Sequence, residues 1–253
     1  PKFAKTKLSF ARETDIFSCS VPAEKLSRED AEKLIDETIL PLQRYGDRQQ
    51  LGRDAQGLQE SILVSPTDAC MEFTYYDGEF SVDSMDRLVD LGLKYFPQKK
   101  SSITMADLGS GVGRLVFYSA LTRGRDENES WTMHGIEIAD ILHDEALRAS
   151  LNGIDSGWFT DKPDQNGNNF ILHKGPASQF LSVLQQCDII FSYSTVWNTI
   201  GFSEELGAMV VSQEWNELLS NSCQKGPVII TTDRALDPGF GFQLEGPEYI
   251  CIV

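Results

Sequence analysis

The sequence predicts an α/β fold, in which a mostly parallel β-sheet carries helices on both of its faces. Short apolar runs with strand character alternate with longer segments in which apolar residues recur at helical spacing. A glycine-rich turn, Asp107–Gly113 with the sequence DLGSGVG, joins one such apolar run to one such helical segment. The chain has 253 residues, which is long enough to bury a sizeable core.

Residues 1–65 are predicted to form a small helical appendage. It is expected to cover the opening of the ligand-binding site in the main domain, residues 66–253. Residues 1–26 are expected to be an extended or partly ordered arm. A helix is expected from Ser27, because this residue suits the N-cap position and acidic residues follow it in the first turn. Pro41 is expected to bend or split that helix, since proline has no backbone N–H.

The main domain is expected to begin with an aromatic loop over 73–80 and a helix with an apolar stripe that Pro97 ends. Strands are then expected at 103–106, 133–137, 170–173, 187–193 and 228–232. Helices are expected at 115–121, 139–151, 178–186 and 203–222, with a long polar loop over 152–168. A closing antiparallel pair is expected at 241–244 and 249–253, after the alternating strands and helices.

The spacing of the glycines selects the ligand of the turn. A dinucleotide fingerprint, G-x-G-x-x-G, would need its third glycine at position 114, where the chain has Arg114. Here the third glycine is Gly113, so an acidic residue is followed by G-x-G-x-G. This pattern resembles the S-adenosylmethionine loop of seven-strand methyltransferases. That cofactor has an ammonium group and no pyrophosphate, and a carboxylate near the turn can help to hold the ammonium group.

A second acidic residue follows the next expected strand. Glu137 ends the apolar run that begins at Met133. A carboxylate at the tip of the next parallel strand is well placed to accept hydrogen bonds from both ribose hydroxyls of a nucleoside. Two signals in this order and spacing predict a nucleoside-containing cofactor more strongly than the glycine turn alone.

The match extends beyond the generic loop. DLGSGVG at 107–113 followed by GIEIADI at 135–141 resembles the Dot-type (disruptor of telomeric silencing) histone-lysine methyltransferases. The segment Tyr76–Glu79 is similar to that family's Y-G-E loop, with Asp77 inserted. The resemblance covers about residues 73–235 and is strong in its first half. It implies a Rossmann-like seven-strand methyltransferase sheet, S-adenosylmethionine as cofactor and a protein lysine as methyl acceptor.

The resemblance also implies roles for single residues. The cofactor-binding residues would be Glu79, Asp107, Gly109, Ser110, Gly111, Gly113, Glu137 and Ile138. The residues around the transferring methyl group would be Tyr76, Ser192 and Tyr193. A lysine acceptor must lose its proton, and a narrow aromatic channel that excludes water favours the neutral amine. Tyr76, Tyr193 and Trp197 are candidate walls of such a channel.

The chain departs from the family pattern at two places. Pro176-Ala177 stands where the family has an acidic–aromatic pair that contacts adenine, so adenine must be held differently. Ser192-Tyr193-Ser194 replaces an amide-bearing segment beside the methyl group, and the family's basic nucleosome-binding tail is absent within this chain. Two alternatives therefore stay open: a small-molecule methyltransferase on the same fold, and a cofactor-binding module without catalysis.

The composition limits which kinds of binding partner and which cellular compartment are expected for the chain. The formal net charge is −16, from 22 basic and 38 acidic residues, which argues against nucleic-acid binding through a broad basic surface. No apolar run is long enough to span a membrane. An intracellular protein, cytoplasmic or nuclear, with reduced thiols is expected, because the five cysteines are scattered and odd in number, and none of them form the C-x-x-C pair of a zinc site. No metal is expected, since His134, His143 and His173 have no metal-ligand spacing.

Overall fold

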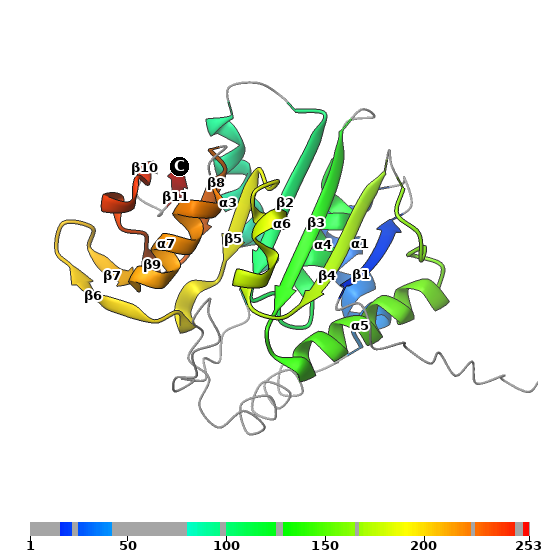
Figure 1. Cartoon of the computed structure of the whole chain (residues 1–253). Coiled ribbons are helices and arrows are strands. Elements are labelled where there is room, and N and C mark those ends of the chain that lie inside the picture. Colours follow the sequence, from blue (N-terminus) through cyan, green and yellow to red (C-terminus); the bar gives the residue numbers. More distant parts are fainter. Residues whose placement is uncertain are drawn as a thin grey trace, which may run out of the picture.

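The computed structural model describes residues 16–21, 25–41, 80–96, 100–124, 129–164, 167–223, 226–245 and 250–252. These residues form an α/β fold around an eight-stranded sheet in the order β1-β4-β3-β2-β5-β8-β11-β10 (Figure 1). The strands are β1 (Ile16–Val21), β2 (Ser102–Leu108), β3 (Ser130–Glu137), β4 (Asn168–Lys174), β5 (Ile189–Ser192), β8 (Val228–Thr231), β10 (Gln243–Glu245) and β11 (Ile250–Ile252).

The centre of the sheet is parallel. Strand β2 pairs in parallel with β3 and β5, β3 with β4, and β5 with β8, while β1, β10 and β11 pair antiparallel with their neighbours. The predicted α/β class with a Rossmann-like, mostly parallel sheet is therefore confirmed. The closing antiparallel pair is formed by β10 and β11, with β11 beside β8.

Alternating side chains of the strands bury into two separate cores. On β5, Ile189 and Phe191 enter one core and Ile190 enters the other, as the two-residue period of a strand requires. The first core also contains side chains of α1 (Arg28–Leu34), α3 (Val82–Gly92), α4 (Arg114–Thr122) and α5 (Asp140–Asp155). The second contains those of α6 (Leu181–Leu184) and α7 (Gln213–Ser222). Figure 1 shows α6 and α7 on the near face of the sheet and α1 and α4 behind it.

The beginning of the chain differs from its prediction. Residues 16–21, expected within an extended or partly ordered arm, form β1, the edge strand that pairs with β4 from Ile16–His173 to Val21–Asn168. Cys19 and Val21 enter the core, which explains why this segment adds to the sheet. The expected helix exists as α1 and a π-helical turn, Ile35–Ile39, and stops before Pro41. The rest of the predicted appendage lies outside the described residues.

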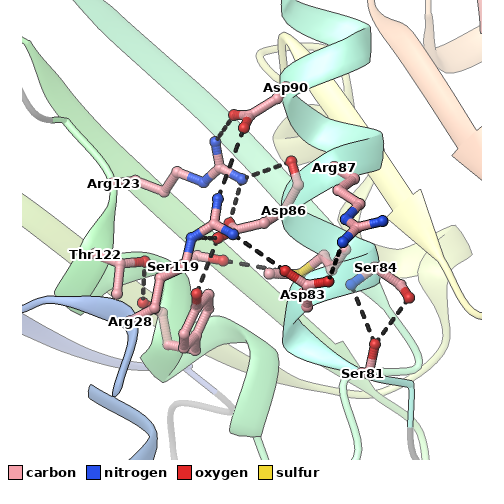
Figure 2. A network of polar contacts seen from close by, with 12 residues as sticks. Arg28, Ser81, Asp83, Ser84, Asp86, Arg87, Asp90, Ser119, Thr122 and Arg123 are labelled. Atoms are coloured by element: carbon pink, nitrogen blue, oxygen red, sulfur yellow. Dashed lines mark hydrogen bonds and ion pairs between the residues drawn. The ribbon is translucent and has the colours of Figure 1, made fainter. Parts of the chain in front are cut away.

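The N-terminal helix is joined to the main domain by a buried carboxylate. Asp86 of α3 is 2% exposed and forms an ion pair of 2.9 Å with Arg28 of α1. The same carboxylate pairs with Arg123 and accepts a hydrogen bond of 2.9 Å from the hydroxyl of Tyr118. Figure 2 shows the two guanidinium groups converging on α3, where Asp83 and Asp90 also contact them. Three helices are therefore held together at one point.

The predicted helix over 203–222 is wrong in its first half. The segment forms the hairpin of β6 (Thr199–Ser203) and β7 (Ala208–Val211), and only α7 is helical. With β9 (Arg234–Ala235) the hairpin makes a second sheet in the order β6-β7-β9. Gly207 turns the chain with a φ of +66°, and the β-branched pair Val210-Val211 favours a strand over a helix. The apolar residues at helical spacing in the first half of this segment therefore belong to a hairpin and not to a helix.

Smaller differences between the prediction and the structure concern the bounds of the helices. Helix α5 continues to Asp155, beyond the predicted end at 151. The helix expected over 178–186 is a 3₁₀ turn, Ala177–Phe180, followed by the single-turn α6. Further 3₁₀ turns are Leu93–Tyr95, Ser194–Val196 and Pro238–Phe240.

Within the described part of the chain, no helix combines the length and the apolar character that crossing a membrane requires.

Candidate functional site

The glycine turn lies at the carboxyl ends of β2 and β3 and leads into α4. Gly109, Gly111 and Gly113 all have positive φ, at 79°, 56° and 83°. The backbone N–H groups of Gly109 and Ser110 donate to the carbonyl of Ile136, at 2.9 and 3.2 Å. The turn is therefore tied to β3, and its left-handed residues explain why glycine occupies these positions.

Glu137 connects the end of β3 to the glycine turn through its side chain. Its Oε2 accepts a hydrogen bond of 2.7 Å from the N–H of Gly111, and its Oε1 accepts one of 2.7 Å from the N–H of Ala139. Burial raises the pKa of Glu137, and the backbone N–H groups of Ala139, Gly111 and Ile138 oppose that shift. A carboxylate has about four acceptor sites, so it retains capacity for a ligand hydroxyl beside these three backbone donors.

Asp107 places a second buried carboxyl group beside the first. It is the next-to-last residue of β2 and is 3% exposed. Burial, followed by repulsion from Glu137, raises the pKa of Asp107 to about 7. Two neighbouring buried carboxyl groups favour a cationic ligand and disfavour a phosphate, because a phosphate would add further negative charge.

The turn leaves open space in front of two of its glycines. A Cβ atom built on Gly109 or on Gly111 would have no heavy atom within 4 Å. A Cβ on Gly113 would lie 2.9 Å from the ring of Phe117, and one on Gly135 would lie 2.9 Å from Oγ of Ser110. Gly113 and Gly135 thus serve packing, whereas Gly109 and Gly111 leave the backbone accessible to a ligand.

The candidate residues at and after the end of β5 occupy different environments. Ser192 is 1% exposed, and its hydroxyl donates a hydrogen bond of 3.0 Å to the carbonyl of Leu108. The half-buried Tyr193 has its ring centroid 5.3 Å from that of Phe80. Trp197 is 4% exposed and stacks on Trp215 at 3.8 Å, so it packs within the second core.

Ser192 therefore joins β5 to the end of β2, and its hydroxyl proton is used in that contact. The roles of Ser192 and Tyr193 near a methyl group stay predictions. Tyr76 and Glu79, the other two residues predicted from the Y-G-E-like loop, lie outside the described residues. The structure thus brings together Asp107, the glycine turn, Glu137 and Ile138 from the predicted set.

The turn after β4, where the chain departs from the family pattern, is tied to β3 through the backbone. Pro176 begins a 3₁₀ turn in which Ala177 is buried. The N–H of Gly175 donates to the backbone carbonyl of Glu137 at 2.9 Å. This backbone hydrogen bond consequently fixes the end of β3 to the turn that follows β4.

Sequence reasoning missed the backbone N–H of Ala139 as a partner of Glu137. Ala139 is the N-cap residue of α5. The first N–H groups of a helix have no partner within it, so an acidic residue shortly before a helix start often accepts from them. The contact could have been predicted from the sequence, because a helix was expected to begin directly after Glu137.

The three histidines of the chain come together although their spacing gave no sign of it. Nδ1 of His134 and Nε2 of His173 lie 2.8 Å apart on neighbouring strands. His143 of α5 is close enough to lower the pKa of His173. In the described ranges, no group of three or more His, Cys, Asp or Glu side chains has an arrangement that could hold a metal ion.

Comparison with known proteins gives structural likeness only. No protein-family profile matches the sequence, and no curated protein matches it. Among solved structures, a methyltransferase of Thiobacillus denitrificans in complex with S-adenosyl-L-homocysteine is similar, with 19% identity over 58% of this chain and 47% of that chain and a TM-score of 0.31. One from Geobacter sulfurreducens, also with S-adenosyl-L-homocysteine, has 22% identity over 58% and 47% of the two chains and a TM-score of 0.31.

A third similar structure is a Listeria monocytogenes protein described as a class I S-adenosylmethionine-dependent methyltransferase. It has 14% identity over 81% of this chain and 72% of that chain, with a TM-score of 0.37. This chain spans 47% of the Thiobacillus and Geobacter structures that it matches. Scores in this range assign neither family nor activity, so any function has to be argued from the site itself.

Proposed function

We propose that the chain is an S-adenosylmethionine-dependent methyltransferase. The observation that carries the proposal is the cluster of Asp107, the glycine turn and Glu137 at the carboxyl ends of β2 and β3. In open α/β sheets, ligands bind outside the carboxyl ends of the strands. The carboxylates suit a ligand with an ammonium group and a ribose, and they oppose one with a pyrophosphate.

Different residues of the site would bind different parts of the cofactor. S-adenosylmethionine, when bound, supplies a methyl group activated on a sulfonium. Glu137 is already held by Gly111 and Ala139, so its remaining lone pairs are oriented before the ribose hydroxyls arrive. Asp107 would pair with the ammonium group, and the open space in front of Gly109 would admit the methionine part. Ile138 is half-buried next to Glu137 and would contact the nucleoside.

Positioning is the main task of such a site, because methyl transfer is an in-line displacement that needs the acceptor aligned behind the methyl group. A protein side-chain amine is the acceptor that the Dot-type resemblance favours. A small molecule is the second candidate. It is supported by the net charge of −16 and by Ser192, which stands where the family pattern has an amide-bearing segment and whose hydroxyl is bonded to Leu108.

Calorimetric titration of the purified chain with S-adenosylmethionine and S-adenosylhomocysteine tests the cofactor. We expect saturable heat with one site for both ligands. No detectable heat and no thermal shift at millimolar ligand would overturn the proposal. Titration with NAD is the matched control, because a dinucleotide brings its pyrophosphate against Asp107 and should not bind.

A labelled methyl-transfer screen tests the acceptor, with free histones, nucleosomes and small-molecule extracts as substrates. We expect weak or no transfer to nucleosomes, because the net charge of −16 is repelled by DNA and gives no phosphate contacts. Free histone or an unrelated acceptor should be methylated in preference. Robust methylation of one nucleosome site at physiological salt would contradict the charge argument and favour the family acceptor.

A further inference from the structure

The hairpin of β6 and β7 presents large apolar side chains to solvent. Ile200 and Phe202 of β6 are each 63% exposed, against 52% or less for the other exposed large apolar residues of the described chain. None of the five residues of β6 is buried. Isolated exposed apolar residues are ordinary, but two on one short strand mark a candidate contact surface.

These two side chains border a hollow rather than a flat surface. The hollow has a volume of about 480 Å³ and is lined by Ile200, Phe202, Leu206, Val210 and Pro238, together with Glu205 and Asp237. This volume falls within the usual range of binding pockets, roughly 300–1,000 Å³. Its walls combine apolar surface with carboxylates and contain no basic residue.

The charge around the hollow selects the partner. Glu205 and Asp237 line the hollow, and no lysine or arginine among the described residues does. The guanidinium of Arg234 in the same small sheet is bonded to the carbonyls of Thr195 and Asp233. A segment with basic side chains would therefore be attracted. A second copy of this chain would be repelled, because each copy carries a net charge of −16.

The form of β6 argues for recognition through side chains. Its pairing with β7 shifts register between Thr199 and Gly201, and Gly201 has a φ of +142°. A bulge of this kind twists an edge strand and hinders the addition of a further strand. A partner would thus insert side chains into the hollow instead of extending the sheet.

The hairpin also has a defined place in the fold. Strand β6 follows the carboxyl end of β5 through the turn Ser194–Val196, and β9 follows the carboxyl end of β8. Asp107 and Glu137 lie at the carboxyl ends of parallel strands in the same sheet. Figure 1 shows the small sheet beside that end of β5.

We infer that the β6–β7 hairpin is the docking surface for a segment of another protein that combines basic and apolar side chains. Its apolar side chains enter the hollow against Ile200 and Phe202, and its basic side chains pair with Glu205 and Asp237. The inference deepens the proposed function, on which it rests for the assignment of this segment as part of the methyl-acceptor protein.

Fluorescence anisotropy with a labelled synthetic peptide that alternates lysine and leucine tests the surface. Two matched peptides, with glutamate for lysine and with serine for leucine, are the controls. We expect binding of the first peptide only. The double substitution Ile200→Ser and Phe202→Ser should weaken it about tenfold or more, as loss of buried apolar contact predicts. Glu205→Gln should weaken it severalfold and reduce its dependence on salt.

Leu181→Ser and Glu29→Gln are matched control variants on other exposed positions, and both should bind the peptide like the original chain. Unchanged binding by the double variant, or equal affinity for the glutamate peptide, would overturn the inference. Sedimentation that shows a dimer lost in the double variant would overturn it in favour of self-association.

The titrations are repeated with and without S-adenosylhomocysteine. Peptide binding without any cofactor binding would contradict the proposed function alone, and cofactor binding without peptide binding would contradict the docking surface alone.

Discussion

The backbone N–H of Gly111 donates a hydrogen bond of 2.7 Å to Oε2 of Glu137, so a side chain joins the glycine turn to the next strand of the sheet. The carboxylate is buried and already oriented by the protein. A group held in its binding geometry loses little further freedom when a ligand arrives. This contact therefore links the stability of the turn to its capacity to bind a nucleoside.

Replacing Glu137 with alanine should weaken binding of S-adenosylhomocysteine more than replacing Glu79 with alanine. The Glu137 variant leaves two ribose hydroxyls and two backbone N–H groups poorly paired, at a cost of about 1–3 kcal/mol. Calorimetric affinities of the two variants and the original chain measure the difference. Equal affinities for the original chain and the Glu137 variant would contradict the ribose assignment.

Cofactor affinity should increase with pH from about 6 to 8. Burial and Glu137 raise the pKa of Asp107 to about 7, so below that pH the free protein holds a proton on this group. A ligand ammonium group requires the ionised form, and binding then releases the proton. Calorimetry at about pH 6 in buffers of different ionisation enthalpy should detect this release. Asp107→Asn should bind weakly and without this pH dependence, and a pH-independent affinity for the original chain would argue against the contact.

Gly113→Ala and Gly109→Ala should separate stability from binding. Alanine at 113 needs a φ near +83° and places its Cβ 2.9 Å from Phe117, so we expect a loss of about 2–4 kcal/mol in unfolding free energy. Alanine at 109 meets open space and should cost about 1–2 kcal/mol, yet should interfere with cofactor binding. Urea unfolding and calorimetry measure the two effects. The prediction fails if Gly109→Ala binds the cofactor normally.

The histidine pair should make the fold less stable as pH falls from about 6.5 to 4. Burial lowers the pKa of His134 to about 3 and that of His173 to about 4, so the unfolded chain takes up protons that the folded chain does not. Protonation of both rings would also disrupt their 2.8 Å contact. The raised pKa of Asp107 has the opposite sign, since it favours the folded state as pH falls through about 7 to 3.8.

Comparing urea unfolding of His134→Gln with that of the original chain across this pH range removes the common contribution of Asp107. The variant should show a smaller loss of stability on acidification. Parallel curves for the two proteins would mean that the pair does not titrate as described.

Asp86→Ala should destabilise the chain strongly, by about 3–5 kcal/mol, because it leaves Arg28 and Arg123 without their buried partner. Tyr118→Phe removes one hydrogen bond to the same carboxylate and should cost only about 1 kcal/mol. Urea unfolding of both variants gives the comparison. Similar costs for the two substitutions would show that the ion pairs contribute little.

The glycine turn shows what sequence alone determined. The order of apolar strand, DLGSGVG and helix predicted β2, the turn and α4 near their observed bounds, since each depends on residues close in sequence. The same holds for β3 with Glu137 at its tip. Glycine at positive φ and the two-residue period of buried strands are local requirements, and they can be read without knowing the neighbours.

Tertiary structure decided the rest. Residues 16–21 became β1 because the edge of β4 was available to pair, and the helical spacing over 203–211 gave way to a hairpin that buries Val210 and Val211. The hydroxyl of Ser192 turned to Leu108, and the carboxylate of Glu137 turned to Gly111. The β6–β7 hairpin is itself local, but β7 also pairs with β9 and Val211 packs in the second core. The other contacts join segments far apart in sequence, so the free energy that selects them exists only once the sheet has assembled.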